Sequence, residues 1–483
     1  MQYGERPRER KSIMPVLYDI TAKLPSDAVV IPVSALRQNE WELFAASLPP
    51  AMFNFAKARG FTAETGQKLQ LPNQDGHIAH ILLGCGPEEK DQLGPMQFGG
   101  LSAYLGEGLY RLEKMPADWD MRLAAIAWGL GAYRFDEYLK SQVTPPTLVL
   151  DDDLDLPEIE AVVSGTKLCR DLINLPAGDL GPVALQQAAE DLAKEYDAPV
   201  KTVIGEELLQ QNYPMIHAVG RAAHEEPRLV EFEWGDPSHP RLAVIGKGIT
   251  FDTGGVNMKS ASGARLMKKD MGGAAHALAL AKMIMATKLP IRLHCLIAVA
   301  ENAVSAGAYR PGDILQSRAG LTVEIDNTDA EGRLVLGDAL CKAAEDNPVL
   351  MINFATLTGA ARVALGPHLP PFFSNRQGPV EAVLSQAGRE RDPVWPMPLW
   401  QPYNSMLSSP IADFKNAGGA FAGSVTAALF LERFVKGLPW MHFDTYGWNP
   451  SARPSHPKGG DMYAVRALYA WLKSGGINSD FTA

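Results

Sequence analysis

Short apolar runs alternate with Ala- and Leu-rich helical stretches along the C-terminal two-thirds of the chain, and this alternation limits the folds that the chain can adopt. The predicted strands and helices are, in chain order, residues 242–245, 273–286, 291–300, 321–325, 333–345 and 349–354. Strands that alternate with helices predict a mainly parallel sheet that is flanked by helices on both faces. Such sheets bind ligands beyond the carboxyl ends of their strands.

The first 150 residues predict a smaller α/β domain, in which residues 28–33 and 77–83 have the pattern of strands. An acidic, proline-bearing segment at residues 145–153 ends this pattern. The segments predicted from this change are residues 1–150 (N-terminal α/β domain), 151–165 (linker with a linking helix from about Pro157) and 166–483 (C-terminal domain). A length of 483 residues agrees with two domains.

The segment that follows residues 321–325 places the carboxylates of Asp329 and Glu331 and the guanidinium of Arg333 at alternate positions. If the direction of the strand persists, all three side chains point to one side. Two acids and one base that converge predict a site for hard cations with an anion beside them. Taken alone, a run of this kind is more often a solvated loop.

A second polar cluster follows the run at 242–245 and contains Lys247, Asp252, Lys259 and Asp270. Its glycines allow tight turns and a close approach of the backbone to a ligand. Asp270 directly precedes an Ala-rich helix, so an N-cap is its alternative role. Lys247 and the glycine after it could indicate a phosphate loop, but the Walker spacing of glycines is missing.

Together the two clusters resemble the leucyl (cytosol) aminopeptidase family of dinuclear metallopeptidases. The motifs G-K-G-I-T-F-D, a lysine seven residues after that aspartate, M-x-x-D-M-G-G-A-A and N-T-D-A-E-G-R-L all occur, in order. The similarity extends from about residue 169 to the end of the chain. It implies a metal-dependent aminopeptidase that hydrolyses N-terminal residues from peptides with a water activated by two metal ions.

The resemblance also implies the ligands of two divalent ions per chain. One ion is held by Asp252, Asp329 and Glu331, and the other by Lys247, Asp252, Asp270 and Glu331. Lys247 can coordinate only as a neutral amine, so nearby cations must lower its pKa from about 10.4. Oxygen and amine ligands are compatible with zinc, manganese, magnesium or cobalt; manganese and zinc are favoured. His276 is interpreted as a packed or solvent-facing histidine rather than a ligand, and His442 as a residue that satisfies local hydrogen bonds near the pocket wall.

Two further residues have catalytic roles by the same resemblance. Lys259 is a charged lysine that polarises the scissile carbonyl and stabilises the developing oxyanion. Arg333 binds bicarbonate, which takes a proton from the bridging water. This assignment explains an active site without an evident side-chain base.

The substrate pocket is expected to contain Met267, Asn327, Thr356, Leu357 and Gly359. Relatives usually have small or aliphatic residues where this chain has Tyr446 and Trp448, and these positions line the pocket for the first side chain. If both rings face the pocket, they narrow or reshape it; the alternative is that they pack at an interface.

The altered pocket motivates a second hypothesis, a two-metal hydrolase of dipeptides or other aminoacyl amides. A third is a non-catalytic nucleic-acid-binding or architectural homologue, against which the intact set of site residues argues.

Composition sets the remaining expectations. A net charge of −10 disfavours nucleic acid as a general partner. Four cysteines without paired spacing suit free thiols in a reducing compartment. Residues 1–11 lack a hydrophobic signal core, and no apolar run is long enough for a bilayer, so a cytoplasmic protein without a membrane segment is expected. The family resemblance implies self-association as a homohexamer.

Overall fold

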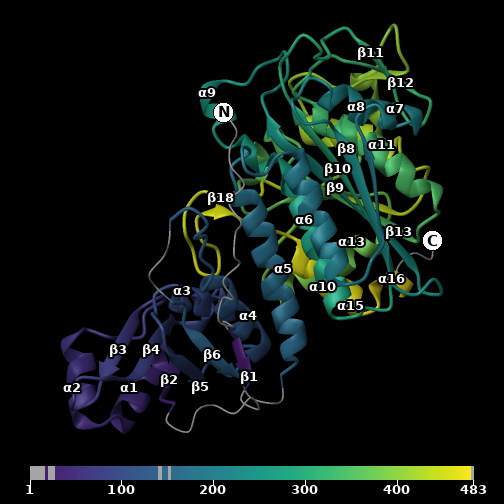
Figure 1. The fold of residues 1–483 in the computed structure, drawn as a ribbon. Coiled ribbons are helices and arrows are strands. Elements are labelled where there is room, and N and C mark those ends of the chain that lie inside the picture. The colour runs from purple at the N-terminus through teal and green to yellow at the C-terminus, as the bar shows by residue number, and fades with distance from the viewer. Residues whose placement is uncertain (1–16, 20–27, 140–143, 151–153, 480–483) are drawn as a thin grey trace. The chain divides into compact units, whose positions relative to one another are not determined.

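The computed structural model describes residues 17–19, 28–139, 144–150 and 154–479 of the chain (Figure 1). The chain forms two compact units, Met1–Leu156 and Pro157–Ala483. The segment at residues 1–11 and residues 151–153 of the predicted linker lie outside the described residues. Among the described residues, no helix has both the length and the apolar composition needed to cross a bilayer.

The first unit is built on a six-stranded sheet in the order β1-β6-β5-β2-β4-β3. Its strands are β1 (Leu17–Asp19), β2 (Val30–Arg37), β3 (Lys68–Pro72), β4 (Ile78–Gly86), β5 (Leu109–Lys114) and β6 (Thr147–Leu150). All neighbours pair in parallel except β3, which lies antiparallel at the edge. The longer helices are α1 (Gln38–Ser47), α2 (Pro50–Ala58) and α4 (Met121–Gly131). Both predicted strands of this unit are present, as β2 and β4.

The second unit contains an eight-stranded sheet in the order β15-β14-β17-β13-β9-β10-β8-β7. Its strands are β7 (Val200–Ile204), β8 (Arg228–Trp234), β9 (Arg241–Asp252), β10 (Arg292–Asn302), β13 (Leu350–Ala355), β14 (Pro371–Ser374), β15 (Trp395–Pro396) and β17 (Trp440–Asp444). The four central strands, β17 to β10, run parallel. Towards the edges β14, β8 and β7 join antiparallel. The predicted α/β class with a mainly parallel centre is confirmed, with antiparallel additions on both sides.

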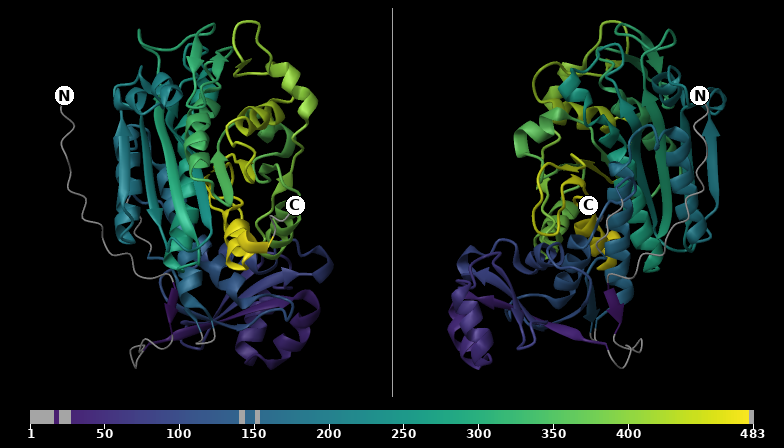
Figure 2. Two further views of the ribbon diagram at one scale, coloured as in Figure 1. Left: turned by 90° about the vertical axis from the view of Figure 1, so that its right-hand side faces the viewer. Right: turned by 60° about the vertical axis from the view of Figure 1, so that its left-hand side comes forward.

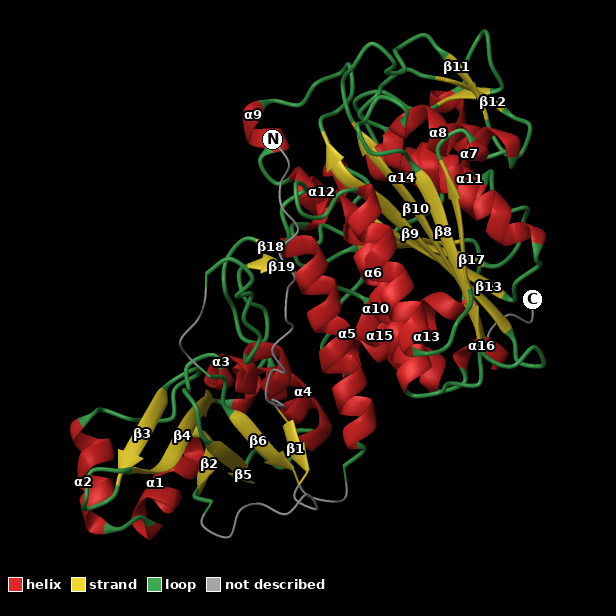
Figure 3. Ribbon diagram, in the orientation of Figure 1, coloured by secondary structure: helices red, strands yellow, loops and turns green. Residues whose placement is uncertain are grey.

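Helices cover both faces of this sheet, as the views in Figures 1 and 2 show. One face carries α6 (Pro182–Glu195), α10 (Gly272–Ala286) and α15 (Val465–Lys473), and the other carries α8 (Pro214–Gly220), α11 (Glu331–Glu345) and α14 (Gly423–Glu432). The second face has a core in which Ala243 and Ile245 of β9 meet Leu336 and Leu340 of α11. Figure 3 shows the twist of the strands between the two helical layers.

Two expectations about residues 321–333 are wrong. The predicted strand at 321–325 is the short β12 (Thr322–Glu324), which belongs to a separate three-stranded sheet with β11 (Ile314–Gln316) and β16 (Phe414–Lys415). The strand direction also does not persist to Arg333, because α11 already begins at Glu331. Glu331 and Arg333 therefore leave from the first turn of a helix, and strand alternation does not explain their placement.

The long helix α5 (Leu156–Asn174) is tied to the C-terminal part of its own unit by a buried charge cluster. Arg170 contacts the carboxylate of Asp461 at 2.9 Å, and His456 Nδ1 lies 2.6 Å from the other oxygen of Asp461. Burial alone would raise the pKa of Asp461, but His456 and Arg170 outweigh it and hold that pKa well below its usual value. The ionised form of Asp461 therefore stabilises the folded state.

Replacement of Asp461 by Asn is expected to lower the midpoint of thermal unfolding strongly at neutral pH. The change leaves Arg170 buried without its anion, which costs about 3–5 kcal/mol in comparable cases. A carboxyl whose folded pKa is lowered contributes stability above its unfolded pKa of about 3.9, and that contribution is lost as the pH falls through the folded pKa. The difference between the two proteins should therefore shrink below about pH 4. Glu381→Gln, an exposed change on α13 (Gly378–Arg389), is the control; an equal deficit at every pH would contradict this account.

Candidate active site

Strand β9 contributes Lys247 and Asp252 to the site. These residues are an odd number of positions apart, and a bulge in the strand lets both face the same cavity. Strict alternation would place Lys247 and Asp252 on opposite faces of the sheet. Between Ile249 and Asp252, however, β9 has one residue more than its partner β10, where Ala300 and Asn302 are the matching positions. A bulge of this kind re-aims the side chains that follow it. Lys247 and Asp252 both line one cavity as a result.

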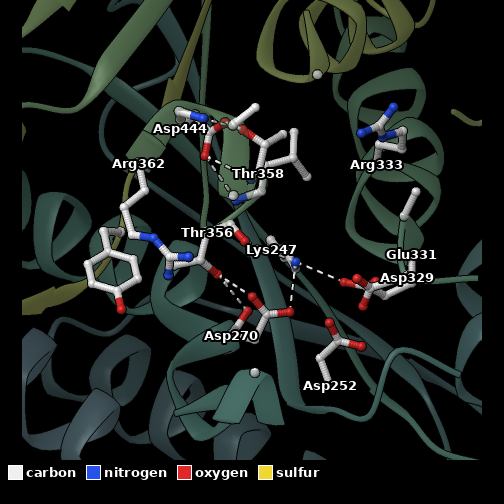
Figure 4. Close-up of a pocket in the computed structure, with 18 of the residues that line it drawn as sticks. Lys247, Asp252, Asp270, Asp329, Glu331, Arg333, Thr356, Thr358, Arg362 and Asp444 are labelled. Atoms are coloured by element: carbon white, nitrogen blue, oxygen red, sulfur yellow. Dashed lines mark hydrogen bonds and ion pairs between the residues drawn. The ribbon is translucent and has the colours of Figure 1, made fainter. Parts of the chain in front are cut away.

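Asp270 approaches Lys247 from a different element, the 3-10 helix η3 (Met267–Met271) that leads into α10. Lys247 Nζ lies 2.7 Å from Oδ2 of Asp270 and 2.9 Å from Oε1 of Glu331 (Figure 4). The hydroxyl of Thr356 donates to Asp270 Oδ1 at 2.7 Å. Asp270 is therefore held by β9 and by the loop after β13, and it is not the N-cap of α10, which is Met271.

Asp329 and Glu331 are brought to the same place by the turn before α11. One carboxylate oxygen from each of Asp252, Asp329 and Glu331 lies within 4.8 Å of the others. Lys259 Nζ is 2.8 Å from Asp252 and also contacts Asp329. In this structure the two lysines, Lys247 and Lys259, are the cations that compensate the four carboxylates.

Hydrogen bonds from neighbouring residues fix the orientation of this cluster. Asn302 donates to Asp252 Oδ1 at 2.8 Å and to the carbonyl oxygen of Thr328 at 3.1 Å. Asn327, predicted to bind substrate, lines the cavity, but its side-chain oxygen accepts the backbone N–H of Asp329 at 2.9 Å. Asn327 therefore also shapes the acidic turn. The sequence reasoning did not identify Asn302 as a residue of the site.

The cavity has a volume of about 500 Å³. Every predicted site residue except Trp448 lines it. Trp448 begins β18 (Trp448–Asn449), where Lys268 lies 5.6 Å from its ring centre. The assignment of Trp448 to the substrate pocket is therefore not supported, because its ring packs outside the lining. Tyr446 does line the cavity.

Burial and mutual repulsion strongly perturb the acids of the cavity. Burial, followed by the charge of Asp252, raises the pKa of Glu331 to about 8 and that of Asp329 to about 6. Burial lowers the pKa of Lys247, but Asp270 and Glu331 outweigh this effect and hold it above its ordinary value. Oε2 of Glu331 is buried and has no hydrogen-bond partner among the described residues. The four carboxylates therefore carry more negative charge than Lys247 and Lys259 compensate, and among the described residues Oε2 of Glu331 receives no hydrogen bond.

Arg333 lines the same cavity on the side of Glu331 and Asp329, away from Arg362 (Figure 4). Its Nη1 donates to the carbonyl oxygen of Asn416 at 2.7 Å, whereas its Nε is buried and has no hydrogen-bond partner in the part of the chain that the structure describes. Burial lowers the pKa of Arg333 to about 10, so the guanidinium is still charged at neutral pH. A buried cation with an unused donor fits a small anion.

Both histidines considered in the sequence are buried and hydrogen-bonded within the fold. His276 Nδ1 lies 2.7 Å from the carbonyl oxygen of Gly272, and burial lowers the pKa of His276 to about 4. His442 is hydrogen-bonded to Asn353, and burial lowers its pKa to about 3. Neither residue lines the cavity.

Three charged residues that line the cavity were not identified from the sequence: Lys269, Arg362 and Asp444. Asp444 accepts from the backbone N–H groups of Leu357 and Thr358 at 3.0 and 3.1 Å, and so fixes the loop after β13. Burial lowers the pKa of Lys269 to about 8. The signal in the sequence that could have indicated Lys269 and Arg362 is their positive charge beside the motifs of the site.

Divalent cations fit the residues of the cavity. The four carboxylates come from separate elements, crowd together against repulsion, and retain a buried oxygen without a partner. Hard divalent cations bind such oxygen clusters. The cavity lies beyond the carboxyl ends of parallel strands, has the size of a small substrate and is lined by buried carboxylates and lysines. These features place the site in the class of metallohydrolases.

Comparison with known proteins identifies the family within this class. Residues 167–469 match the model of the cytosol aminopeptidase family, catalytic domain, and residues 31–151 match that of the M17 aminopeptidase, N-terminal domain. The chain belongs to the cytosol aminopeptidase family. The predicted family, fold class and activity are confirmed, and the chain is a metal-dependent aminopeptidase.

Individual relatives match over most of their length. A probable cytosol aminopeptidase of Syntrophotalea carbinolica is 38% identical over 458 residues, which are 88% of this chain and 92% of the relative. A solved structure of the cytosol aminopeptidase from Coxiella burnetii has a TM-score of 0.89 at 40% identity, over 95% of this chain and 99% of that chain. The bottromycin maturation enzyme BotP, in complex with Mn, has a TM-score of 0.83 at 31% identity, over 92% of this chain and 99% of that chain.

Replacement of Gly332 by Ala is expected to weaken metal binding. A Cβ atom at this position would lie 2.6 Å from both Cε and Nζ of Lys247, so the amine must leave its position between Asp270 and Glu331. Changes to groups that orient metal ligands typically cost 10–100-fold in affinity, so a loss of about that size is expected. The measurement is metal titration of the stripped protein by calorimetry.

The matched control for this experiment is Gly388→Ala on α13, where a Cβ atom would meet nothing within 4 Å. Both variants should keep the native circular dichroism spectrum. If Gly332→Ala binds metal as tightly as the control does, the position of Lys247 does not matter for the ions.

Proposed function

We propose that this chain is an aminopeptidase in which the four-carboxylate cavity holds two divalent ions, manganese or zinc. The observation that carries the proposal is the buried cluster of Asp252, Asp329 and Glu331, whose oxygens lie within 4.8 Å of one another. Asp270 and Lys247 complete the set on the other side, and Asp252 and Glu331 would bridge the two ions. The relative BotP was solved with Mn, which supports manganese as the first metal to test.

The ions, when bound, would supply Lewis-acid polarisation of the peptide carbonyl and a water nucleophile of lowered pKa. Asp270 would accept the free α-amine of the peptide, because its carboxylate faces the cavity and is fixed by Thr356. This contact restricts cleavage to the first residue of the chain. Lys259 would stabilise negative charge on the carbonyl oxygen, since its ammonium lies in the cavity beside Asp252.

Arg333 would bind bicarbonate, whose chemistry in the site is that of a general base. The buried guanidinium with an unpartnered Nε supports this assignment. No histidine lines the cavity, and the carboxylates are needed as metal ligands, so the described side chains offer no better base.

The proposal also covers the setting in which the enzyme works. Relatives named cytosol aminopeptidases support a cytoplasmic location. Assembly into a homohexamer and the domain bounds 1–150, 151–165 and 166–483 rest on the sequence reasoning alone. Light scattering after size-exclusion chromatography measures the assembly.

Hydrolysis of a panel of aminoacyl-aminomethylcoumarins by the metal-stripped protein, with manganese, zinc, cobalt or magnesium added back, tests the function. We expect metal-dependent release of the fluorophore. Asp329→Ala should lose bound metal and activity together. Lys259→Met should keep the metal but reduce kcat by about 10²–10³-fold, the typical effect of removing one oxyanion donor.

The matched control is Lys194→Met, an exposed lysine on α6. It should retain both metal and kcat. Absence of hydrolysis for every substrate and metal, in protein that binds two ions per chain, would refute the aminopeptidase proposal. Loss of metal in Lys259→Met would refute the role given to Lys259.

A further inference from the structure

One wall of the cavity carries two cations beside one aromatic ring. Lys269 Nζ lies 4.9 Å from the ring centre of Tyr446, and the guanidinium carbon of Arg362 lies 5.0 Å from the same centre. The three residues come from η3, from α12 (Gly359–Leu365) and from the loop after β17, and all three line the cavity. We call Lys269, Arg362 and Tyr446 the basic wall.

The charges of the basic wall have no hydrogen-bonded anion among the described residues, and Asp270 and Asp444 attract Lys269 only from a longer distance. Among the described residues, the side chains of Lys269 and Arg362 have neither a hydrogen-bond nor an ion-pair partner; their contact is with the Tyr446 ring. The two nearby acids are used elsewhere. Asp270 contacts Lys247 and Thr356, and Asp444 accepts from the loop after β13. The residue Lys269 is only 5% exposed, so bulk water compensates little of its charge.

The basic wall lies on the side of the cavity where the first residue of a peptide would be held. Lys269 directly precedes Asp270, which we propose as the partner of the α-amine. Figure 4 shows Arg362 on the side of Thr356 and Asp270, away from Asp329 and Arg333. The Cα of the first residue is one bond from its amine, so its side chain leaves from the neighbourhood of Asp270. The rest of the peptide continues beyond the scissile carbonyl, away from that amine.

We propose that the basic wall binds the side-chain carboxylate of an aspartate or glutamate at the first position, so that this aminopeptidase prefers acidic N-terminal residues. The inference rests on the proposed function of the cavity. An apolar first side chain would leave the buried ammonium of Lys269 desolvated against aliphatic carbon, which is unfavourable. A carboxylate would accept charge-assisted hydrogen bonds from both cations and leave the Tyr446 ring as a flat apolar surface beside them.

The test compares isosteric first residues on one leaving group. We expect kcat/KM of the metal-loaded enzyme to be about tenfold higher for Glu-aminomethylcoumarin than for Gln-aminomethylcoumarin, since hydrogen bonds to charged groups contribute on that scale. Asp and Asn form a second pair, and Leu and Met report the activity itself. High salt should reduce the Glu to Gln ratio, because the attraction is electrostatic.

Variants of the wall assign the preference to its residues. Arg362→Gln should lower the Glu to Gln ratio several-fold, and Arg362→Glu should bring it below one and raise the ratio of Lys to Gln substrates. Lys269→Met should lower the Glu to Gln ratio as well. Because each ratio is taken within one protein, a general loss of activity cancels. Arg389→Gln, an exposed change in the last turn of α13, is the matched control and should keep the native ratio.

The outcomes separate this inference from the proposed function. Cleavage of Leu and Met substrates with a Glu to Gln ratio of one or less overturns the acidic preference and leaves the aminopeptidase intact. Failure to cleave any substrate overturns the proposed function.

The C-terminal carboxylate of a short peptide is the other anion that the two cations of the basic wall would bind. If Arg362→Gln lowers the ratio of Leu-Gly to Leu-Gly-amide and leaves that of Glu to Gln unchanged, the wall binds that end and the inference is wrong.

Discussion

Repulsion among four buried carboxylates is the constraint on which the rest of the catalytic unit depends. Asp252, Asp270 and the pair Asp329 and Glu331 come from three separate parts of the chain, and their crowding is unfavourable without positive charge between them. In this structure Lys247 and Lys259 provide that charge through contacts below 3 Å. Metal ions would take over the same compensation. The cluster is therefore built for binding cations, and its cost in stability is part of its function.

The scaffold meets this constraint with two local departures from regular structure. The bulge in β9 turns Asp252 to the face that already carries Lys247. The missing Cβ at Gly332 lets the first turn of α11 approach the amine of Lys247. Both departures lie at the carboxyl end of the central strands, where side chains can converge without breaking the helix layers. The regular core below them, in which Ile245 and Leu336 pack together, keeps this edge rigid.

Most of the site could be predicted from the sequence because its residues stand in dense motifs that follow apolar strands and resemble those of a known family. The local conformation was harder. Residues 329–333 looked like an extended alternation because Ala330, the N-cap of α11, offers no side-chain capping bond that would indicate the start of a helix. The β9 bulge leaves no trace in an apolar run, since its register depends on the partner strand. Trp448 was assigned to the pocket with Tyr446, yet β18 directs the chain away after the glycine between them.

The residues that escaped prediction are those whose role depends on tertiary neighbours. Lys269 and Arg362 are separate basic residues in the sequence, and only the fold places both against Tyr446. Their arrangement gives the cavity an internal polarity: the carboxylate of Asp270 and the ammonium of Lys269 stand on consecutive residues. A first residue with an amine and a side-chain carboxylate a few bonds apart carries the opposite pair of charges. The electrostatic complement of this part of the cavity is thus a zwitterion rather than an aliphatic side chain.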